Sequence, residues 1–365
     1  LSMSKAAELA KMGEVLTNGQ IGGRRNMVIN GAMQIAQRGT SGFTTNAAYT
    51  LDRYKVFCPA ASFTLSQSTT APTDFYHSLK IENTSAATPS SGQGGNIFTT
   101  LEGNSVSQLN WGTSNAKTAT LSFYVRANNT GTYCINLENA NGTIGTGSHS
   151  FVAEYTINSA DTWEEKKIVI PGPTVGTWTT DTSLGIVIGW TLEVGSNFET
   201  STTDAWQSGL KRQTSNQVNW QQTASANFHL TGVQFEIGKA TPFEHRSFGE
   251  ELELCHRYFE KRNVDTANYE LLADSGVWTS TTAWQCPVRF KKVMRTAPTI
   301  TNGGTLQVAL RNSPQNITAF NVADNHHGRS ALLYGTTATV SVSAGESARL
   351  QSNSLNAYIQ FDAEL

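Results

Sequence analysis

The sequence predicts an all-β protein with two sandwiches and two short helices, and three observations support this. Short runs of alternating apolar and polar residues recur about every ten residues, separated by clusters of Gly, Ser, Asn and Thr. Only 15% of the 365 residues are charged, where about 25% is usual, and hydroxyl and amide side chains take their place. Helical spacing of apolar residues occurs in only two short segments. Taken in chain order, the elements are expected as follows.

Residues 1–25 are expected to form a short helix and a linker. Apolar residues recur at helical spacing from Leu9 to Leu16, behind a candidate cap at Ser4. A helix of three to four turns is marginal alone in water, so it should dock on another surface or associate with copies of itself. Residues 18–25 are rich in Gly and polar side chains and are typical of a flexible linker.

Residues 26–246 are expected to form the first β-sandwich. Its clearest strand is Asn227–Ile237, where a one-residue shift in the alternation predicts a β-bulge at Gly232. The other runs with strand-like alternation are Thr118–Arg126, Thr132–Leu137, Ser148–Ile157, Lys166–Ile170 and Leu184–Val194.

Residues 247–262 are expected to form a linking helix. Ser247 and Glu250 stand at the spacing of a capping box, in which each side chain satisfies the other's backbone N–H. Leu252, Cys255 and Phe259 then form an apolar stripe of a helix that ends near the basic pair 261–262, which suits the helix dipole.

Residues 263–365 are expected to form a second, smaller β-sandwich. The strand-like runs are Tyr269–Leu272, Thr282–Phe290, Thr299–Thr301, Thr305–Leu310, Asn316–Val322, Thr337–Val342 and Ala357–Ala363. Polar loops are expected at 273–282 and 321–334.

Composition excludes several classes of function. The formal net charge is -2 and no long basic run is present, so nucleic acid is not an expected partner. No segment reaches the roughly 18 apolar residues of a spanning helix, and residues 1–16 lack the apolar core of a secretion signal. Neither membrane insertion nor Sec export is therefore expected. The four cysteines lie far apart in sequence, which favours buried, reduced thiols.

Two stretches resemble a jelly-roll domain of bacteriophage tail-fibre and related virion proteins. The first runs from Asn26 to Thr40 and continues at Tyr49–Tyr54, and the second runs from Gly232 to Phe259. Together they bracket residues 26–261. The jelly roll of this family is itself similar to that of carbohydrate-binding modules.

The resemblance implies a homotrimeric fibre in the virion tail, assembled in the cytoplasm of the bacterial host. Its N-terminus would join other virion tail proteins, and its C-terminal part would bind a host surface glycan. We therefore expect binding in residues 263–365, where three weak sites on one tip would act by avidity. The apolar sides of the 247–262 helix would pack around the trimer axis.

Other functions stay open at this stage. A head-decorating or adaptor fibre is one alternative, and a polysaccharide-degrading tail spike or a secreted carbohydrate-binding module is another. We expect no enzyme activity, because no GxSxG, HExxH or phosphate-loop motif occurs. Five carboxylates are candidates for glycoside cleavage, but their turn and outward strand positions favour simple solvation: Asp161, Glu164, Glu165, Glu193 and Glu199.

Aromatic residues in polar surroundings are the candidates for stacking against a sugar. In the second sandwich these are Trp278 and Tyr334, in the two polar loops expected there. In the first sandwich they are Trp111, Trp178 and Trp206. Three further tryptophans lie in or beside strands and are expected in the core: Trp163, Trp190 and Trp220.

No cofactor is expected, but two metal sites are candidates. His326 and His327 would meet their copies at a trimer axis and could bind a transition metal there, although adjacent loop residues usually point apart. Glu236 lies where similar sugar-binding jelly rolls hold a structural calcium, beside backbone oxygens near Asn30 and Gly31. Calcium takes six to eight oxygen ligands, and the sequence offers one carboxylate here.

Overall fold

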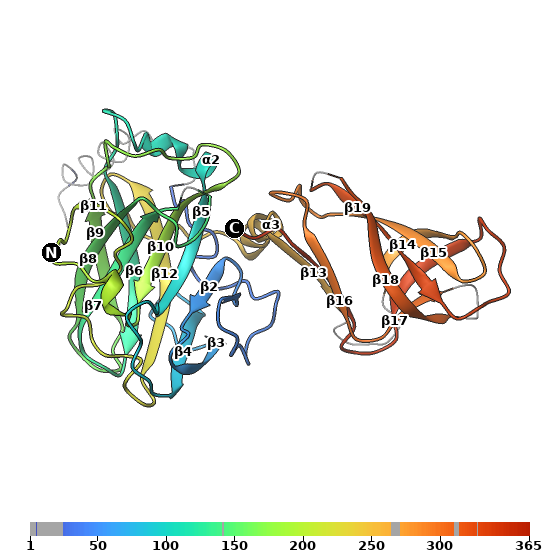
Figure 1. Ribbon diagram of the computed structural model, residues 1–365, viewed down its shortest axis with the longest axis horizontal. Helices are drawn as coiled ribbons and strands as arrows, with labels where there is room; N and C mark the ends of the chain where they lie inside the picture. The colour runs from blue at the N-terminus through green and yellow to red at the C-terminus, as the bar shows by residue number, and fades with distance from the viewer. Residues whose placement is uncertain (1–4, 6–24, 141, 264–270, 310–313, 327) are drawn as a thin grey trace. The chain divides into compact units, whose positions relative to one another are not determined.

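A computed structural model describes residue 5 and residues 25–140, 142–263, 271–309, 314–326 and 328–365 (Figure 1). Within these ranges the chain is all-β, as predicted. The backbone contacts divide it into two compact units, one ending at Glu251 and the other running from Leu252 to Glu364. The division falls inside the helix between them. Apart from residues 5 and 25, the expected N-terminal helix at 4–16 and the linker at 18–25 lie outside the described residues.

The first unit is a jelly-roll sandwich of two antiparallel sheets (Figure 1). The seven-stranded sheet consists, in spatial order, of β1 (Ala48–Tyr49), β2 (Tyr54–Phe57), β5 (Asn96–Glu102), β10 (Leu184–Thr191), β7 (Gly131–Asn139), β8 (His149–Ile157) and β11 (Trp206–Ser208). The five-stranded sheet consists of β3 (Ser62–Ser68), β4 (Ser78–Ser85), β12 (Asn227–Ile237), β6 (Ala119–Ala127) and β9 (Glu164–Ile170). Short helical turns are α2 (Gly103–Val106), η1 (Ser107–Leu109) and η2 (Ser196–Phe198).

Strand β12 shows how the sequence pattern builds this unit. Its bounds are those predicted, and Phe228 and Leu230 face the core between the sheets. The register then shifts between Thr231 and Gln234, with Gly232 at a φ of 61°, which confirms the predicted bulge. The bulge keeps the later apolar residues of the strand in the core. The core also contains Trp190 and Trp220, as predicted, whereas Trp163 is only half-buried.

The helix α3 (Phe248–His256) is shorter than the sequence predicts. The predicted capping box is confirmed, because the Ser247 backbone N–H donates to Glu250 Oε2 at 3.0 Å and the Glu250 N–H donates to Ser247 Oγ at 3.3 Å. The expected helical end is wrong: Phe259–Asn263 forms strand β13, paired along its whole length with β21 (Tyr358–Asp362). Pairing with a distant strand overrides the local helical pattern.

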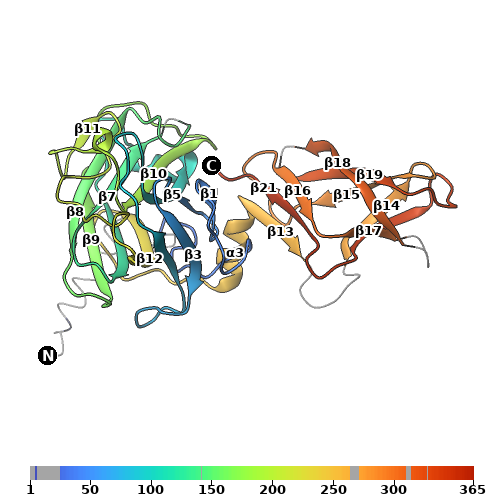
Figure 2. The ribbon, with the colours of Figure 1, turned by 60° about the horizontal axis from the view of Figure 1, so that its bottom comes forward.

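In the second unit the strands form a closed barrel and a separate small sheet, which differs from the expected second sandwich. The barrel order is β14 (Leu271–Trp278), β15 (Ala283–Arg289), β19 (Ser330–Thr337), β18 (Gln315–His326), β17 (Leu306–Ala309) and β20 (Ser347–Ser352). The small sheet, which Figure 2 shows, is β13, β21 and β16 (Thr299–Gly303). The strand expected at 337–342 is wrong. The strand found here is β19, which ends at Thr337 and pairs with β15 on one side and β18 on the other.

The four cysteines are free and buried, as predicted. Burial raises the pKa of the Cys58 thiol to about 12 and that of Cys134 to about 11. Among the described residues, no helix has the length and apolar character needed to cross a membrane.

Candidate functional site

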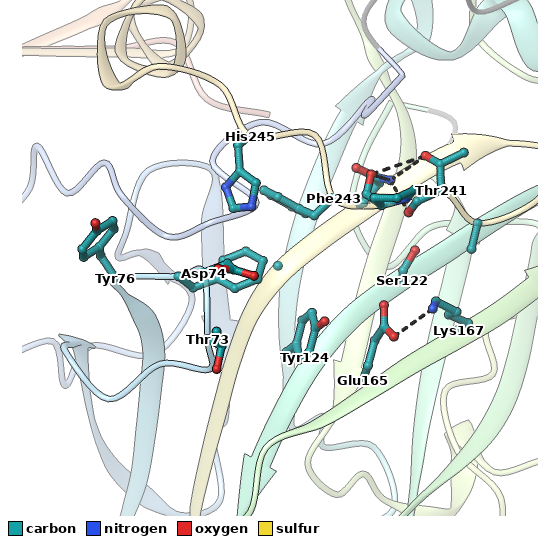
Figure 3. A pocket seen from close by; sticks show the side chains of 15 residues that line it. Thr73, Asp74, Tyr76, Ser122, Tyr124, Glu165, Lys167, Thr241, Phe243 and His245 are labelled. Carbon is teal, nitrogen blue, oxygen red and sulfur yellow. Dashed lines mark hydrogen bonds and ion pairs between the residues drawn. The ribbon is translucent and has the colours of Figure 1, made fainter. Parts of the chain in front are cut away.

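A groove of about 970 Å³ opens on the outer face of the five-stranded sheet (Figure 3). Strands β6, β9 and β12 supply its floor. Two loops supply its rim, one at 73–76 before β4 and the other at 240–245 after β12. All of these residues belong to the first unit. The volume lies in the range of about 300–1,000 Å³ that is typical of small-ligand sites.

One side of the groove is an aromatic wall made of Phe75, Tyr124, Phe243 and His245 (Figure 3). The Phe75 ring lies 5.4 Å from Tyr124, 5.0 Å from Phe243 and 5.2 Å from His245, measured between centroids. Phe243 and His245 contact each other edge to face at 4.8 Å. At the rim the ring of Tyr76 is 80% exposed. These rings come from three separate segments and form one continuous surface.

The opposite side is a polar wall made of Ser122, Glu165, Lys167 and Thr241. Glu165 Oε2 and Lys167 Nζ form an ion pair at 2.8 Å, and both side chains are exposed (Figure 3). Ser122 Oγ is buried and makes no hydrogen bond with the residues that the structure describes. The polar groups that this wall presents to a ligand are therefore mainly those of Glu165 and Lys167.

The bulge at Gly232 makes room for the aromatic wall. A Cβ atom at this position would lie 2.8 Å from Cδ2 of Tyr124 and 2.9 Å from Cζ of Phe75. Both distances are too short for carbon atoms, so any larger residue would displace the rings. The positive φ of 61° also favours glycine. The bulge therefore determines the shape of the groove floor.

Glu236 holds the loop that carries Phe243 and His245. Its Oε1 accepts hydrogen bonds from the Thr241 N–H at 2.8 Å and from Gln234 Nε2 at 2.7 Å, and its Oε2 accepts one from Thr241 Oγ1 at 2.6 Å. This buried carboxylate thus has protein donors on both oxygens, which is a different environment from the expected calcium site. Among the described residues, no group of three His, Cys, Asp or Glu side chains is placed to hold a metal.

The loop that carries Phe75 is held by backbone geometry and by β12. The Phe75 N–H donates to the Pro72 carbonyl at 3.1 Å, and Asp74 between them has a φ of 73°. Thr231 Oγ1 on β12 donates to the His77 carbonyl at 2.8 Å. Both rim loops are therefore anchored to the same strand, so the aromatic wall is largely preformed.

Tyr124 carries the hydroxyl group of the aromatic wall. Burial raises the pKa of its hydroxyl, and the nearby carboxylates of Glu165 and Asp74 raise it further, whereas Lys167 lowers it. The phenol therefore keeps its proton and remains both a donor and an acceptor of hydrogen bonds.

The three tryptophans predicted as sugar platforms in this unit form a structural cluster instead. The rings of Trp111, Trp178 and Trp206 pack edge to face, with centroids 5.0–5.3 Å apart. Each indole N–H donates to a backbone carbonyl, and the acceptors are Lys117, Val175 and Pro171. Trp111 is buried in the core, and the other two are half-buried against it.

Of the candidates in the second unit, Trp278 is fully buried in the core because β14 extends through it. It has no ring face to offer a sugar. Tyr334 lies on β19, opposite Gln285 and Asn321, and is 41% exposed. His327 and the side chain of His326 lie outside the described residues.

A smaller polar pocket of about 270 Å³ contains Glu193 and Glu199. Burial raises the pKa of Glu193, yet both of its oxygens accept hydrogen bonds from Gln221 and Gln222. Glu199 Oε1 accepts one from Gln213 Nε2 at 3.0 Å. These carboxylates hold loops together, and no aromatic ring lines the pocket.

No known protein family and no curated protein matches the sequence. Solved structures similar to it include a protein described as sugar-binding from Bacteroides thetaiotaomicron, with 12% identity, a TM-score of 0.35, and coverage of 59% of this chain and 100% of that one. The enzymatically active domain of bacteriophage CBA120 tailspike protein 4 has 13% identity and a TM-score of 0.32 over 58% of this chain and 21% of its own. The CBM22-2 xylan-binding domain from Paenibacillus barcinonensis Xyn10C has 14% identity and a TM-score of 0.31 over 51% and 92%. The jelly-roll assignment rests on the chain's own strand pairing.

The sequence reasoning missed the residues of the aromatic wall. Phe75 and Tyr76 stand together in one polar loop, and Phe243 and His245 alternate with other residues just after β12. The sequence does show two loops with aromatic residues beside predicted or possible strands. Only the pairing of β4 with β12 in the structure shows that these loops lie together.

Proposed function

We propose that the first unit binds a glycan in the groove between the aromatic and polar walls. Sugar rings have an apolar face that stacks on aromatic rings and a rim of hydroxyls that needs directional hydrogen bonds. The groove offers both on opposite sides. Tyr124, Lys167 and Thr241 line it with polar groups, and Phe75 and Phe243 supply ring area.

The observation that carries the proposal is a preformed ring cluster that faces a polar wall across an open groove. A cluster that served only to fill the core would not line an open groove. The proposal moves the expected binding site from residues 263–365 to the first unit, where more aromatic surface is gathered than around Tyr334.

We further propose that the chain is a phage attachment protein of the virion tail, assembled in the bacterial cytoplasm as a homotrimer and joined to other tail proteins through its N-terminus. This wider role is supported by the resemblance of residues 26–261 to virion fibre proteins. The helix that suggested a trimer axis gives it less support, because Cys255, Tyr258 and Phe259 are already buried in a single chain. Light scattering separates a trimer from a monomer of 39.5 kDa.

The proposed role is binding without catalysis. Glycoside cleavage needs a general acid whose pKa is raised by an apolar environment, together with a second carboxylate. Asp74 and Glu165 in the groove are both exposed, and Glu165 is paired with Lys167. A tail spike enzyme would release reducing ends from its polysaccharide, and a reducing-end assay on each glycan that binds decides between the two functions.

The experiment that tests glycan binding is a titration of the full chain against an array of bacterial-type oligosaccharides, followed by calorimetry on those that bind. The variant Tyr124→Ala should lower affinity about tenfold, since it removes a ring contact and a hydrogen bond. Val169→Ala, at an exposed position on β9 outside the groove, is the matched control. If neither the array nor calorimetry detects binding, the proposal is wrong.

A further inference from the structure

We infer that the groove selects uncharged sugar units and discriminates against sugars that carry a carboxylate. This inference rests on the proposed function and concerns the chemical class of its ligand. It comes from the charges that line the groove, which are Asp74, Glu165 and Lys167 together with the imidazole of His245.

The fixed charges of the groove sum to a net negative value. Lys167 is the single ammonium among the lining residues, and its charge is matched by Glu165 at 2.8 Å. Asp74 makes no ion pair with the residues that the structure describes, and its side chain is exposed at the rim. Beside the groove, Arg25 Nη1 donates to Thr241 Oγ1 at 3.0 Å, and the Glu236 carboxylate bonded to the same hydroxyl offsets its charge. An anionic ligand would therefore meet one uncompensated carboxylate and one ion pair whose lysine is already engaged.

The pKa of the Tyr124 hydroxyl responds to the same three charges. Glu165 and Asp74 both favour the neutral phenol and Lys167 opposes them, so two carboxylates and one ammonium act on the space between the walls. A ligand carboxylate placed beside this hydroxyl would feel both carboxylates. A neutral hydroxyl or acetamido group would instead gain a donor and an acceptor from the phenol.

The aromatic wall is a second reason why a ligand carboxylate should be disfavoured. The faces of aromatic rings carry the negative part of the ring quadrupole, so they attract the C–H groups of a sugar and repel anions. Phe75 and Phe243 form the middle of this wall, 5.0 Å apart. A carboxylate at C6 of a stacked sugar would lie near these ring faces.

The test uses pairs of oligosaccharides that differ only in oxidation at C6: mannose and mannuronate, galactose and galacturonate, glucose and glucuronate oligomers of equal length and linkage. For the pair that binds, the full chain should bind the uronate about tenfold more weakly at low salt, which corresponds to about 1.4 kcal/mol. Salt at about 0.5 M should reduce the difference, because it screens exposed charges.

The double variant Asp74→Asn, Glu165→Gln should remove the difference or reverse it, because Lys167 then lacks its acidic partner. Asparagine tolerates the positive φ of Asp74, so the rim loop should keep its shape. Glu82→Gln is the matched control, because Glu82 forms a similar exposed pair with Lys80 at 2.6 Å but does not line the groove. This control should leave the ratio of the two affinities unchanged.

In the wild type, equal affinities for the two sugars or a preference for the uronate would overturn the inference. An unchanged ratio in the double variant would overturn it as well. Each of these results would leave glycan binding intact. Absence of binding to every neutral and acidic oligomer would overturn the proposed function and this inference together. A tenfold preference that the double variant removes and the Glu82 control keeps supports the inference.

Discussion

Two aromatic clusters in the same sandwich have opposite consequences. Trp111, Trp178 and Trp206 pack edge to face, and all three N–H groups donate to backbone carbonyls. Phe75 and Phe243 with their neighbours also pack closely, but they line an open groove opposite a polar wall. An aromatic cluster is a candidate binding surface when its ring faces and the nearby polar groups are not fully engaged in contacts within the protein.

The comparison also explains why residue type alone was a poor guide to the sugar-binding residues. Tryptophan in a polar segment suggested a sugar platform, yet these segments supply the carbonyls that accept hydrogen bonds from the indole N–H groups. The groove uses phenylalanine, tyrosine and histidine, whose positions come from a bulge and two anchored loops. Stability should therefore depend on the first cluster and binding on the second.

The largest expected effect is on stability. Trp111→Ala should lower the free energy of unfolding by about 3–5 kcal/mol, because it removes a large ring from the core and leaves a cavity. Tyr76→Ala, at the rim of the groove, should change it by less than about 0.5 kcal/mol. Urea unfolding followed by tryptophan fluorescence and circular dichroism measures both. Similar losses in the two variants would show that the clusters do not differ in this way.

A second prediction concerns the groove floor. Gly232→Ala should weaken glycan binding about tenfold and destabilise the first unit by about 2 kcal/mol, because the new Cβ displaces the rings of Tyr124 and Phe75. Gly209→Ala separates strain from displacement, since Gly209 also has a positive φ but no atom lies within 4 Å of its added Cβ. That control should cost about 1 kcal/mol and leave binding unchanged. Equal effects of the two substitutions on affinity would count against the role of the bulge.

A smaller effect is expected at the covered part of the same sheet face, where His229 is buried. Arg126 Nη1 lies 3.3 Å from His229 Nε2, so the ring must accept there and is neutral. Burial, with the charges of Arg126 and Lys80, lowers the pKa of His229 to about 3. The unfolded chain binds the proton below about pH 6.5 and the folded chain does not until about pH 3, so stability falls as pH drops through this window.

The stability lost through His229 should be about 1 kcal/mol between pH 6.5 and 5.5. Unfolding curves of the wild type and of His229→Gln, measured across this range, test the assignment. The variant should have a flatter dependence of stability on pH. If both proteins lose stability in parallel, another group is responsible.

The elements that the sequence predicted well have a strong local signal. Strand β12 alternates along its whole length and contains its own bulge, and the capping box of Ser247 is complete within four residues. Strand β5 was missed because every one of its residues is buried, so no alternation remains. Trp278 and Tyr334 were placed in loops because polar residues and glycines stand close to them in the sequence, yet both lie on barrel strands.

The groove could not be predicted for a different reason. Its rings become neighbours only when β4 pairs with β12 and the loops at their ends meet above Gly232. No local pattern specifies that pairing. Glu236 was singled out from the sequence, but the donors that occupy its oxygens come from a loop whose path depends on the same strand.

The central claim is that the groove in the first unit, rather than the exposed tyrosine of the second, is the glycan site. The most direct test compares the affinity of the full chain for one oligosaccharide after Phe243→Ala and after Tyr334→Ala, with both proteins shown to be folded by circular dichroism. The account predicts about a tenfold loss for Phe243→Ala and no change for Tyr334→Ala. A loss for Tyr334→Ala with unchanged binding by Phe243→Ala would contradict it.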